Sequence, residues 1–127
     1  MSTRCAGLGE VFADGVAYVL SRDPDEVRVP DASFVSRDRI PASGVPVGYW
    51  LLAPDLAVEV VSPNDRAEEV HNKVQVYLSS GVRTVWVLWP RSRSVSTHER
   101  DGLSRELGAD DDLEGGDALP GFRVRVG

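Results

Sequence analysis

The sequence has little cysteine and no long apolar run. Its one cysteine, Cys5, excludes an internal disulfide and any metal site built on several cysteines, and it fits a reducing compartment. No apolar run approaches the roughly 20 residues that span a bilayer. The N-terminus also lacks the long apolar segment of a secretory signal. These absences predict a cytoplasmic protein without a membrane segment.

Positive charge is also scarce, because the formal net charge of the 127 residues is −6. Lysine and arginine drive phosphate binding, so this balance counts against a broad nucleic-acid-binding face. Acidic residues gather in residues 110–117, whereas Arg28, Arg37, Arg39 and Arg66 lie nearer to the candidate site described below. The net charge therefore weakens a nuclease interpretation, and the local arginines keep it open.

Lysine is the rarest of the charged residues, with Lys73 alone against thirteen arginines. Either residue serves solubility, but only lysine readily lowers its pKa on burial and can act as a base. Lys73 follows Glu59 by fourteen residues, and Glu59 lies within an apolar run. A strand carboxylate, a nearby aspartate and a unique lysine are the minimal set for metal-assisted phosphodiester hydrolysis.

The middle of the chain predicts a strand, a helix and a second strand. Residues 55–61 (DLAVEVV) form an almost continuous apolar run, which is typical of a strand covered on both faces. The cluster at residues 62–65 (SPND) can cap a helix, and apolar residues then recur at helical spacing as far as Gly81. This pattern predicts a helix over 65–80. Thr84–Trp89 predicts the second strand, parallel to the first because the crossover is right-handed.

Shorter strands are expected on both sides of this unit. The pattern predicts strands at residues 16–20 and Ala32–Ser36, then a loop at 40–48 that carries residues 49–51 against the body. Residues 94–98 and 103–107 flank Asp101-Gly102 and predict a hairpin, and residues 119–122 (LPGF) predict a turn into a last strand. The three tryptophans, together with Phe34 and Tyr77, are expected in the core rather than as a base-stacking platform. The predicted class is α/β to α+β, in one domain.

Glu59 is the strongest anomaly, because every other side chain in residues 56–61 is apolar. An ionised carboxylate in such a strand is costly unless it is paired or binds a cation. The alternative is that Glu59 faces an open sheet surface or pairs with an arginine. Asp55 shares its sheet face by the two-residue period and is a weaker ligand candidate.

Lys73 and Asp31 complete the candidate set. Lys73 lies about 90° from the centre of the apolar helix stripe, so its long side chain can reach the sheet. The alternative is a solvated lysine paired with Glu69 four residues earlier. Asp31 follows Pro30 at the start of a predicted strand, although Pro-Asp is also common in turns.

Several segments together resemble one family. They are VRVPDASFV (27–35), PDLAVEVVSP (54–63), Lys73 with Tyr77, Gly81-Val82, VWV (85–87) and LPGF (119–122). In this order they resemble the Uma2 family, which is common in bacteria, over nearly the whole chain from about residue 10. That family is similar to a branch of the PD-(D/E)XK restriction-endonuclease-like superfamily. The resemblance implies a single domain over 1–127 with a mixed central β-sheet, one main helix at 65–80 and a C-terminal β-hairpin.

The resemblance also implies roles for individual residues. Asp31 matches the acidic residue of the PD half-motif, and Glu59 matches the (D/E) position. The lysine of the triplet would fall at Val61, and Lys73 of the following helix takes its place.

These roles imply an Mg²⁺- or Mn²⁺-dependent endonuclease. Asp31, Glu59 and the Val60 backbone carbonyl would hold the metal, and Lys73 would act on the attacking water or the transition state. Arg37, Arg39 and Arg66 are weaker candidates for holding the phosphates of nucleic acid, with DNA as the expected substrate.

The chain departs from the family pattern at its start. Family members usually begin with a further segment that contains a Glu-Leu-Ile-Asp-Gly-like strand and a helix with a histidine, and the sequence here lacks it. Either the start is misassigned, the protein is a shortened, N-terminally truncated family member, or a partner supplies the missing layer. A missing helix would leave one sheet face poorly covered, which predicts self-association or marginal stability. The alternative function is a catalytically inactive module that binds proteins or its own copies.

Overall fold

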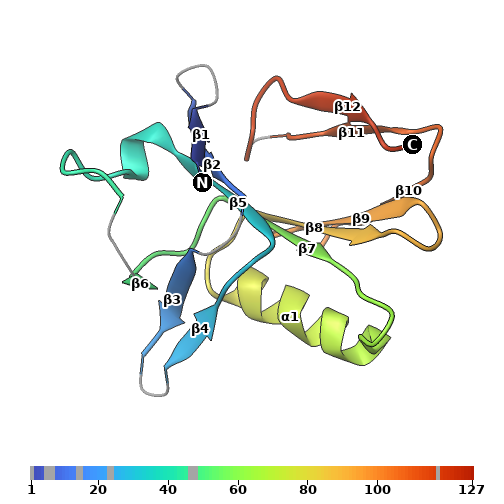
Figure 1. Cartoon of the computed structure of the whole chain (residues 1–127), viewed down its shortest axis with the longest axis horizontal. Coiled ribbons are helices and arrows are strands. Elements are labelled where there is room, and N and C mark those ends of the chain that lie inside the picture. Colours follow the sequence, from blue (N-terminus) through green and yellow to red (C-terminus); the bar gives the residue numbers. More distant parts are fainter. Residues whose placement is uncertain (1, 5–7, 14–15, 23–24, 46–48, 117) are drawn as a thin grey trace.

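The computed structural model describes the chain except for residues 1, 5–7, 14–15, 23–24, 46–48 and 117 (Figure 1). Within this part, no helix is long and apolar enough to cross a membrane. The elements, in chain order, are β1 (Ser2–Arg4), β2 (Gly9–Phe12), β3 (Ala17–Ser21), β4 (Glu26–Arg28), β5 (Ala32–Ser36), the 3₁₀ turn η1 (Arg37–Arg39), β6 (Tyr49–Trp50), β7 (Leu56–Val60), α1 (Ala67–Ser79), β8 (Thr84–Trp89), β9 (Ser94–Glu99), β10 (Ser104–Leu107), β11 (Asp112–Glu114) and β12 (Arg123–Arg125).

The main sheet has seven strands in the order β1-β2-β5-β7-β8-β9-β10. β7 and β8 run parallel, with Leu56 opposite Thr84, and the other neighbouring pairs are antiparallel. A parallel pair needs a crossover, and α1 supplies it. The predicted mixed sheet, its main helix and the hairpin of β9 and β10 are therefore confirmed.

The start of α1 differs from the prediction. Residues 62–65 do not cap the helix, because Asp65 Oδ2 accepts the Ser62 backbone N–H at 2.9 Å within a turn of its own. The helix begins at Ala67, and the N–H of the preceding Arg66 donates to Glu69 Oε1 at 3.3 Å. A short aspartate side chain that is satisfied inside the turn is not available to the helix amides.

The end of α1 agrees with the prediction. Gly81 has a φ of +104°, and the Val82 N–H donates to the Tyr77 carbonyl at 3.1 Å. Glycine adopts this left-handed conformation without a steric penalty, so it closes the helix and directs the chain into β8.

Both faces of the central strands are covered, as the apolar run at 55–61 predicts. Figure 1 shows α1 on one side of the sheet and the β11–β12 ladder on the other. On the helix side, Ala57, Val85 and Val87 pack against Val70, Val74 and Tyr77. On the other side, Leu56, Trp86 and Val95 pack against Leu113 and Leu119, with Phe122 nearby.

The poorly covered sheet face that we expected is therefore absent over the described part of these strands. The C-terminal segment fills that side, and residues 112–114 form a strand that the sequence pattern did not indicate. Self-association itself is not tested by this arrangement.

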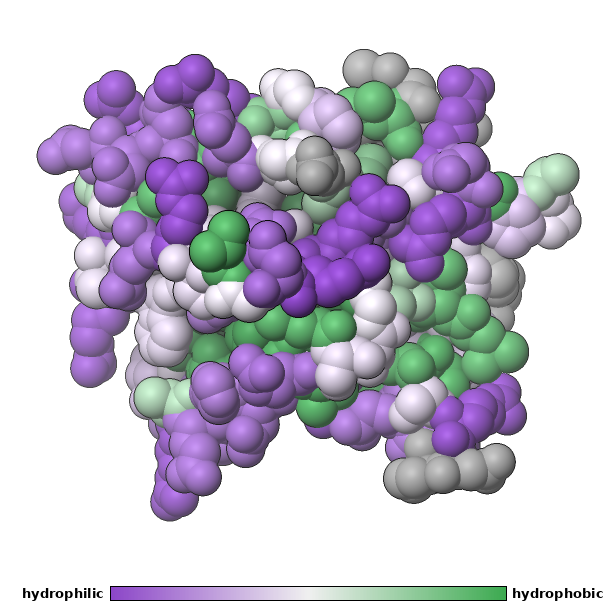
Figure 2. Space-filling view, turned by 180° about the vertical axis from the view of Figure 1, so that it is seen from behind, coloured by the Kyte–Doolittle hydropathy of each residue, from purple (hydrophilic) through white to green (hydrophobic). Residues whose placement is uncertain are grey.

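A smaller sheet of order β4-β3-β6 packs beside β2 and β5. Tyr18 stacks on Trp50 with ring centroids 6.0 Å apart, and its hydroxyl lies 2.7 Å from Ser33 Oγ. Burial raises the pKa of Tyr18 to about 12. The loop at 40–48 was expected to carry residues 49–51 against the body. Residues 49–50 form a short strand parallel to β3, in which Trp50 is buried and Tyr49 is exposed. Figure 2 shows apolar surface gathered at the lower right, where the β3–β4 hairpin lies once Figure 1 is turned round.

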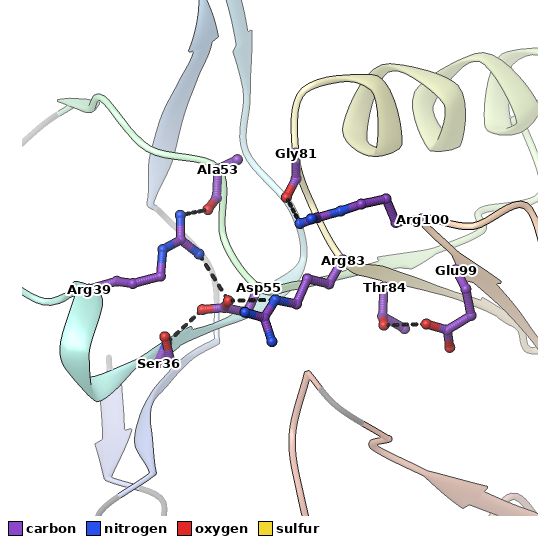
Figure 3. Close-up of polar contacts among 9 residues, drawn as sticks. All are labelled: Ser36, Arg39, Ala53, Asp55, Gly81, Arg83, Thr84, Glu99 and Arg100. Carbon is purple, nitrogen blue, oxygen red and sulfur yellow. Dashed lines mark hydrogen bonds and ion pairs between the residues drawn. The ribbon is translucent and has the colours of Figure 1, made fainter.

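A buried aspartate joins β5, β7 and β8 at the end of the sheet where β7 begins (Figure 3). Asp55 is 2% exposed, and its Oδ2 accepts the Ser36 backbone N–H at 2.7 Å. Its Oδ1 lies 3.0 Å from Arg39 Nη1 and 3.7 Å from Arg83 Nε. Arg39 also donates to the Ala53 carbonyl at 2.6 Å. The carboxylate is thus fully engaged inside the protein.

We expect Asp55→Asn to lower the free energy of unfolding by about 2–4 kcal/mol, because it removes one charge of a buried network. Urea denaturation checks this value. Asp38→Asn, the same change on the exposed turn η1, should leave the urea midpoint almost unchanged. Equal midpoints for the two variants would show that the network contributes little.

Candidate active site

The candidate site lies at the opposite end of β7, where the strand leaves the sheet. β5 and β7 are antiparallel with Ala32 opposite Val58, so Asp31 lies beside the last residues of β7. The Asp31 N–H donates to the Val58 carbonyl at 3.0 Å, and its carboxylate Oδ2 accepts the Val60 N–H at 2.7 Å. These two bonds fix the exposed Asp31 carboxylate next to the residue that follows Glu59.

Glu59 points from β7 toward α1. Its side chain is buried, with the residue 9% exposed, and its two oxygens have different partners. Oε2 accepts the Tyr77 hydroxyl at 2.7 Å, and Oε1 lies 3.7 Å from Lys73 Nζ. The carboxylate therefore lies between the sheet and the helix. Its charged partner is Lys73 and not an arginine, and it does not face an open sheet surface.

Lys73 reaches the sheet, as its position on the helix edge predicts. Its side chain is 43% exposed while its amine lies beside Glu59. The alternative pairing with Glu69 is not what the structure shows, since Glu69 accepts the Arg66 N–H. The Lys73 side chain is thus part-exposed and pairs with a buried carboxylate.

Burial shifts the pKa of both Glu59 and Tyr77, which meet here. It raises the pKa of the Glu59 carboxyl, with a smaller rise from Asp31, while the Tyr77 hydrogen bond and the Lys73 charge oppose the rise. Burial and the neighbouring Glu59 also raise the pKa of Tyr77, so the phenol stays protonated and is the donor. Because the folded protein holds the Glu59 proton more tightly than the unfolded chain, ionisation of Glu59 costs stability as the pH rises above 4.5.

The Val60 carbonyl lies on the same side as Asp31. In a β-strand the N–H and C=O of one residue point to the same side, and the Val60 N–H points to Asp31. The Val61 N–H points the other way, to the Leu88 carbonyl of β8 at 2.9 Å. The Asp31 carboxylate and the Val60 carbonyl therefore lie on the same side at the end of β7, and the Glu59 side chain, from the preceding residue, points toward α1.

The arginine candidates are separated by the fold. Arg66 is exposed just before α1, on the same side of the sheet as the candidate site. Arg37 and Arg39 lie in η1 at the far end of β5, and Arg39 is engaged with Asp55. Asp55 itself lies four residues before Glu59, about 13 Å along the strand, so it is not part of the site.

The family of the chain is established by its match to a family model. The model of Uma2, described as "Putative restriction endonuclease", matches residues 2–127. The chain belongs to the Uma2 family. No curated protein matches it.

A solved structure shares the fold of this Uma2 chain. It is the crystal structure of a putative nuclease belonging to DUF820 from Anabaena variabilis ATCC 29413, with a TM-score of 0.76 and 19% sequence identity. The match covers 94% of the Uma2 chain and 66% of the other protein, so the chain spans about two thirds of that length. The α+β fold of the Uma2 chain is therefore nuclease-like.

The donor set of the Uma2 site suits a hard divalent cation. In the described part of the chain, no three histidine, cysteine, aspartate or glutamate side chains group as metal ligands. Two carboxylates and a backbone carbonyl remain, and they are oxygen donors of the kind that Mg²⁺ and Mn²⁺ prefer. Mg²⁺ commonly takes only one or two carboxylates and completes its shell with water and substrate phosphate. The residues present therefore fit such an ion.

The sequence did not indicate the role of Tyr77, which was expected only as a core residue. It lies four residues after Lys73, one helical turn along the same face, and both side chains approach Glu59. The four-residue spacing of Lys73 and Tyr77 was the feature of the sequence that could have indicated this role. The buried phenol donates to one oxygen of the carboxylate, and the amine of the part-exposed Lys73 side chain lies beside the other.

We expect Tyr77→Phe to destabilise the protein by about 2 kcal/mol at pH 7, because it removes a buried hydrogen bond to a charged group. At pH 4 the cost should shrink, because a protonated Glu59 accepts a weaker hydrogen bond. Urea denaturation at both pH values measures the difference. Tyr49→Phe is the matched control, since Tyr49 is 68% exposed and its variant should stay within about 0.5 kcal/mol at either pH.

Proposed function

We propose that this Uma2 chain is a metal-dependent endonuclease that hydrolyses phosphodiester bonds of nucleic acid. The observation that carries the proposal is the convergence of Asp31, Glu59 and Lys73, which are far apart in the sequence, at the end of β7. The family description and the nuclease-like fold support the same reaction class. The acidic net charge makes a small, local substrate contact more plausible than a broad binding face.

Asp31, Glu59 and the Val60 carbonyl would hold Mg²⁺ or Mn²⁺ in this proposal. When bound, such an ion lowers the pKa of a coordinated water and offsets negative charge on the phosphate. The chain prepares the site by holding both acids in place: Val60 donates to Asp31, and Tyr77 donates to Glu59. The charge of a cation would also favour the ionised form of Glu59, which burial alone disfavours.

Lys73 would act on the attacking water or on the charge of the transition state. Its amine lies 3.7 Å from Glu59 and its side chain is part-exposed, so in this proposal it contacts both a ligand of the metal and an arriving phosphate. A positive group held where charge develops stabilises the transition state without reorganisation. Tyr77 is a positioning residue, since it touches Glu59 rather than the substrate. Arg66 is the best placed of the three arginines to meet a flanking phosphate.

The setting of the enzyme is part of the proposal. We propose a cytoplasmic protein that acts on DNA. A role as a self-associating module is favoured by exposed apolar side chains, of which Tyr49 is 68% and Leu51 is 64% exposed. That role stays a prediction, and the oligomeric state in solution tests it.

Mn²⁺ titration by calorimetry tests the metal site. We expect one class of binding in the wild type, weakened at least about tenfold in Glu59→Ala, which removes an oxygen ligand, and in Asp31→Asn, which removes the negative charge of another. Binding should tighten as the pH rises above 4.5, since the ion binds the carboxylate form of Glu59. Asp38→Asn is the matched control for Asp31→Asn: Asp38 lies on the turn η1 at the far end of β5, so its variant should leave the Mn²⁺ affinity unchanged. Unchanged affinity in Glu59→Ala would mean that the site does not exist.

Cleavage of single- and double-stranded DNA tests the role of Lys73. Lys73→Met should lower the rate by about 100-fold or more, because the amine contributes proton transfer or charge stabilisation. Lys73→Arg separates these two roles: it keeps the charge but is a poor base, so a rate near the wild type assigns Lys73 to charge stabilisation. Equal rates for the wild type and Lys73→Met would remove Lys73 from the mechanism.

A further inference from the structure

A groove of about 380 Å³ opens where β7 and β8 end. One wall comes from the residues that follow β7, and the other from the end of β8 and the residues after it. Val61 and Trp89 contribute to these walls, and both also pack against the core cluster beneath α1. The groove therefore lies on the same face of the sheet as Glu59 and Lys73.

The groove adjoins the candidate active site. Val61 follows Glu59 by two residues on the same face of the strand, which is about 7 Å along the chain. A group bound in the groove is thus roughly one nucleotide away from a phosphate held by the Asp31–Glu59 pair. The volume of the groove falls within the usual range for pockets that bind small molecules.

The apolar part of the groove lining consists of Val61, Pro63, Pro90 and the half-buried Trp89. The Trp89 indole N–H donates to Ser96 Oγ at 2.8 Å, which fixes the ring and uses its only donor. The remaining ring surface can make stacking contacts but no hydrogen bonds. This chemistry suits the π-face of any nucleobase.

The rim of the groove is polar and carries one cation without a partner. Arg91 is exposed and forms no ion pair or hydrogen bond through its side chain with the described residues. Asp65 also lines the groove, but its carboxylate already accepts the Ser62 N–H. A phosphate would therefore approach on the Arg91 side, away from Asp65.

We infer that this groove binds the unpaired nucleobase next to the scissile phosphate, with its ring against Trp89 and a flanking phosphate at Arg91. The inference rests on the proposed nuclease function and names its substrate class. A base in a duplex is stacked and paired, so it enters such a groove only after unstacking, which costs free energy. The preferred substrate is therefore single-stranded nucleic acid or a duplex end with an unpaired nucleotide.

The test compares two probes of equal length and equal phosphate charge. One is a fluorescein-labelled oligothymidylate, and the other is the same chain without bases. Fluorescence anisotropy is measured in the Glu59→Gln background, where the probe is not consumed by the proposed reaction. We expect the probe with bases to bind about tenfold more tightly, because stacking on one aromatic ring is lost in the abasic probe. Equal affinities, or no binding of either probe, would overturn the inference.

Three variants locate the contacts. Trp89→Leu should abolish the preference for the probe with bases, and a preference that survives would place the base elsewhere and refute the inference. Arg91→Gln should weaken both probes alike and reduce the salt dependence of binding. Arg105→Gln, the same change on exposed β10, should alter neither. The comparison of probes in the unaltered groove needs no Trp89 variant, so it stands even if Trp89→Leu does not fold.

Binding and cleavage separate the two proposals. A preference for the probe with bases in a protein whose wild type cleaves no DNA would support the groove and refute the nuclease. Cleavage by the wild type together with equal probe affinities would do the opposite.

Discussion

The structure depends on two acidic side chains placed at the ends of one buried strand. β7 lies between α1 and the C-terminal segment, so neither Asp55 nor Glu59 can be hydrated as it would be on a surface. A carboxylate without water is tolerated only when hydrogen bonds and opposite charges replace the lost hydration. The hydrogen bonds and ion pairs at the two ends of β7 supply these partners.

Asp55 and Glu59 meet this requirement with different partners, and the difference gives Asp55 a structural role and leaves Glu59 as a candidate ligand. Asp55 accepts a backbone N–H and faces two arginines, so its carboxylate has no place left for a ligand. Glu59 has a neutral phenol and one part-exposed amine 3.7 Å away. Fewer charges therefore balance Glu59, and burial raises its pKa. A cation can complete the environment of Glu59 but not that of Asp55.

The lysine that pairs with Glu59 comes from the helix rather than from the strand. Val61, the position at which the resemblance would place a motif lysine, follows β7 and packs under α1 instead. Lys73 and Tyr77 lie one helical turn apart, so a single helix face provides both the charged and the neutral partner of the carboxylate. The parallel β7–β8 pair requires a crossover, and α1 supplies it, so the topology brings the amine to the site.

Local patterns in the sequence determined the strands at Ala32–Ser36 and Thr84–Trp89, the helix between β7 and β8, and its end at Gly81, because periodicity and glycine act over a few residues. They also singled out Asp31, Glu59 and Lys73, since an acid in an apolar run and a unique lysine are visible without coordinates. Only the tertiary structure decided the partners. Asp55 pairs with Arg39 and Arg83, and Glu59 accepts a hydrogen bond from Tyr77. Residues 112–114 form a strand on the side of the sheet opposite α1. Such pairings depend on contacts between distant segments, and no spacing along the chain records them.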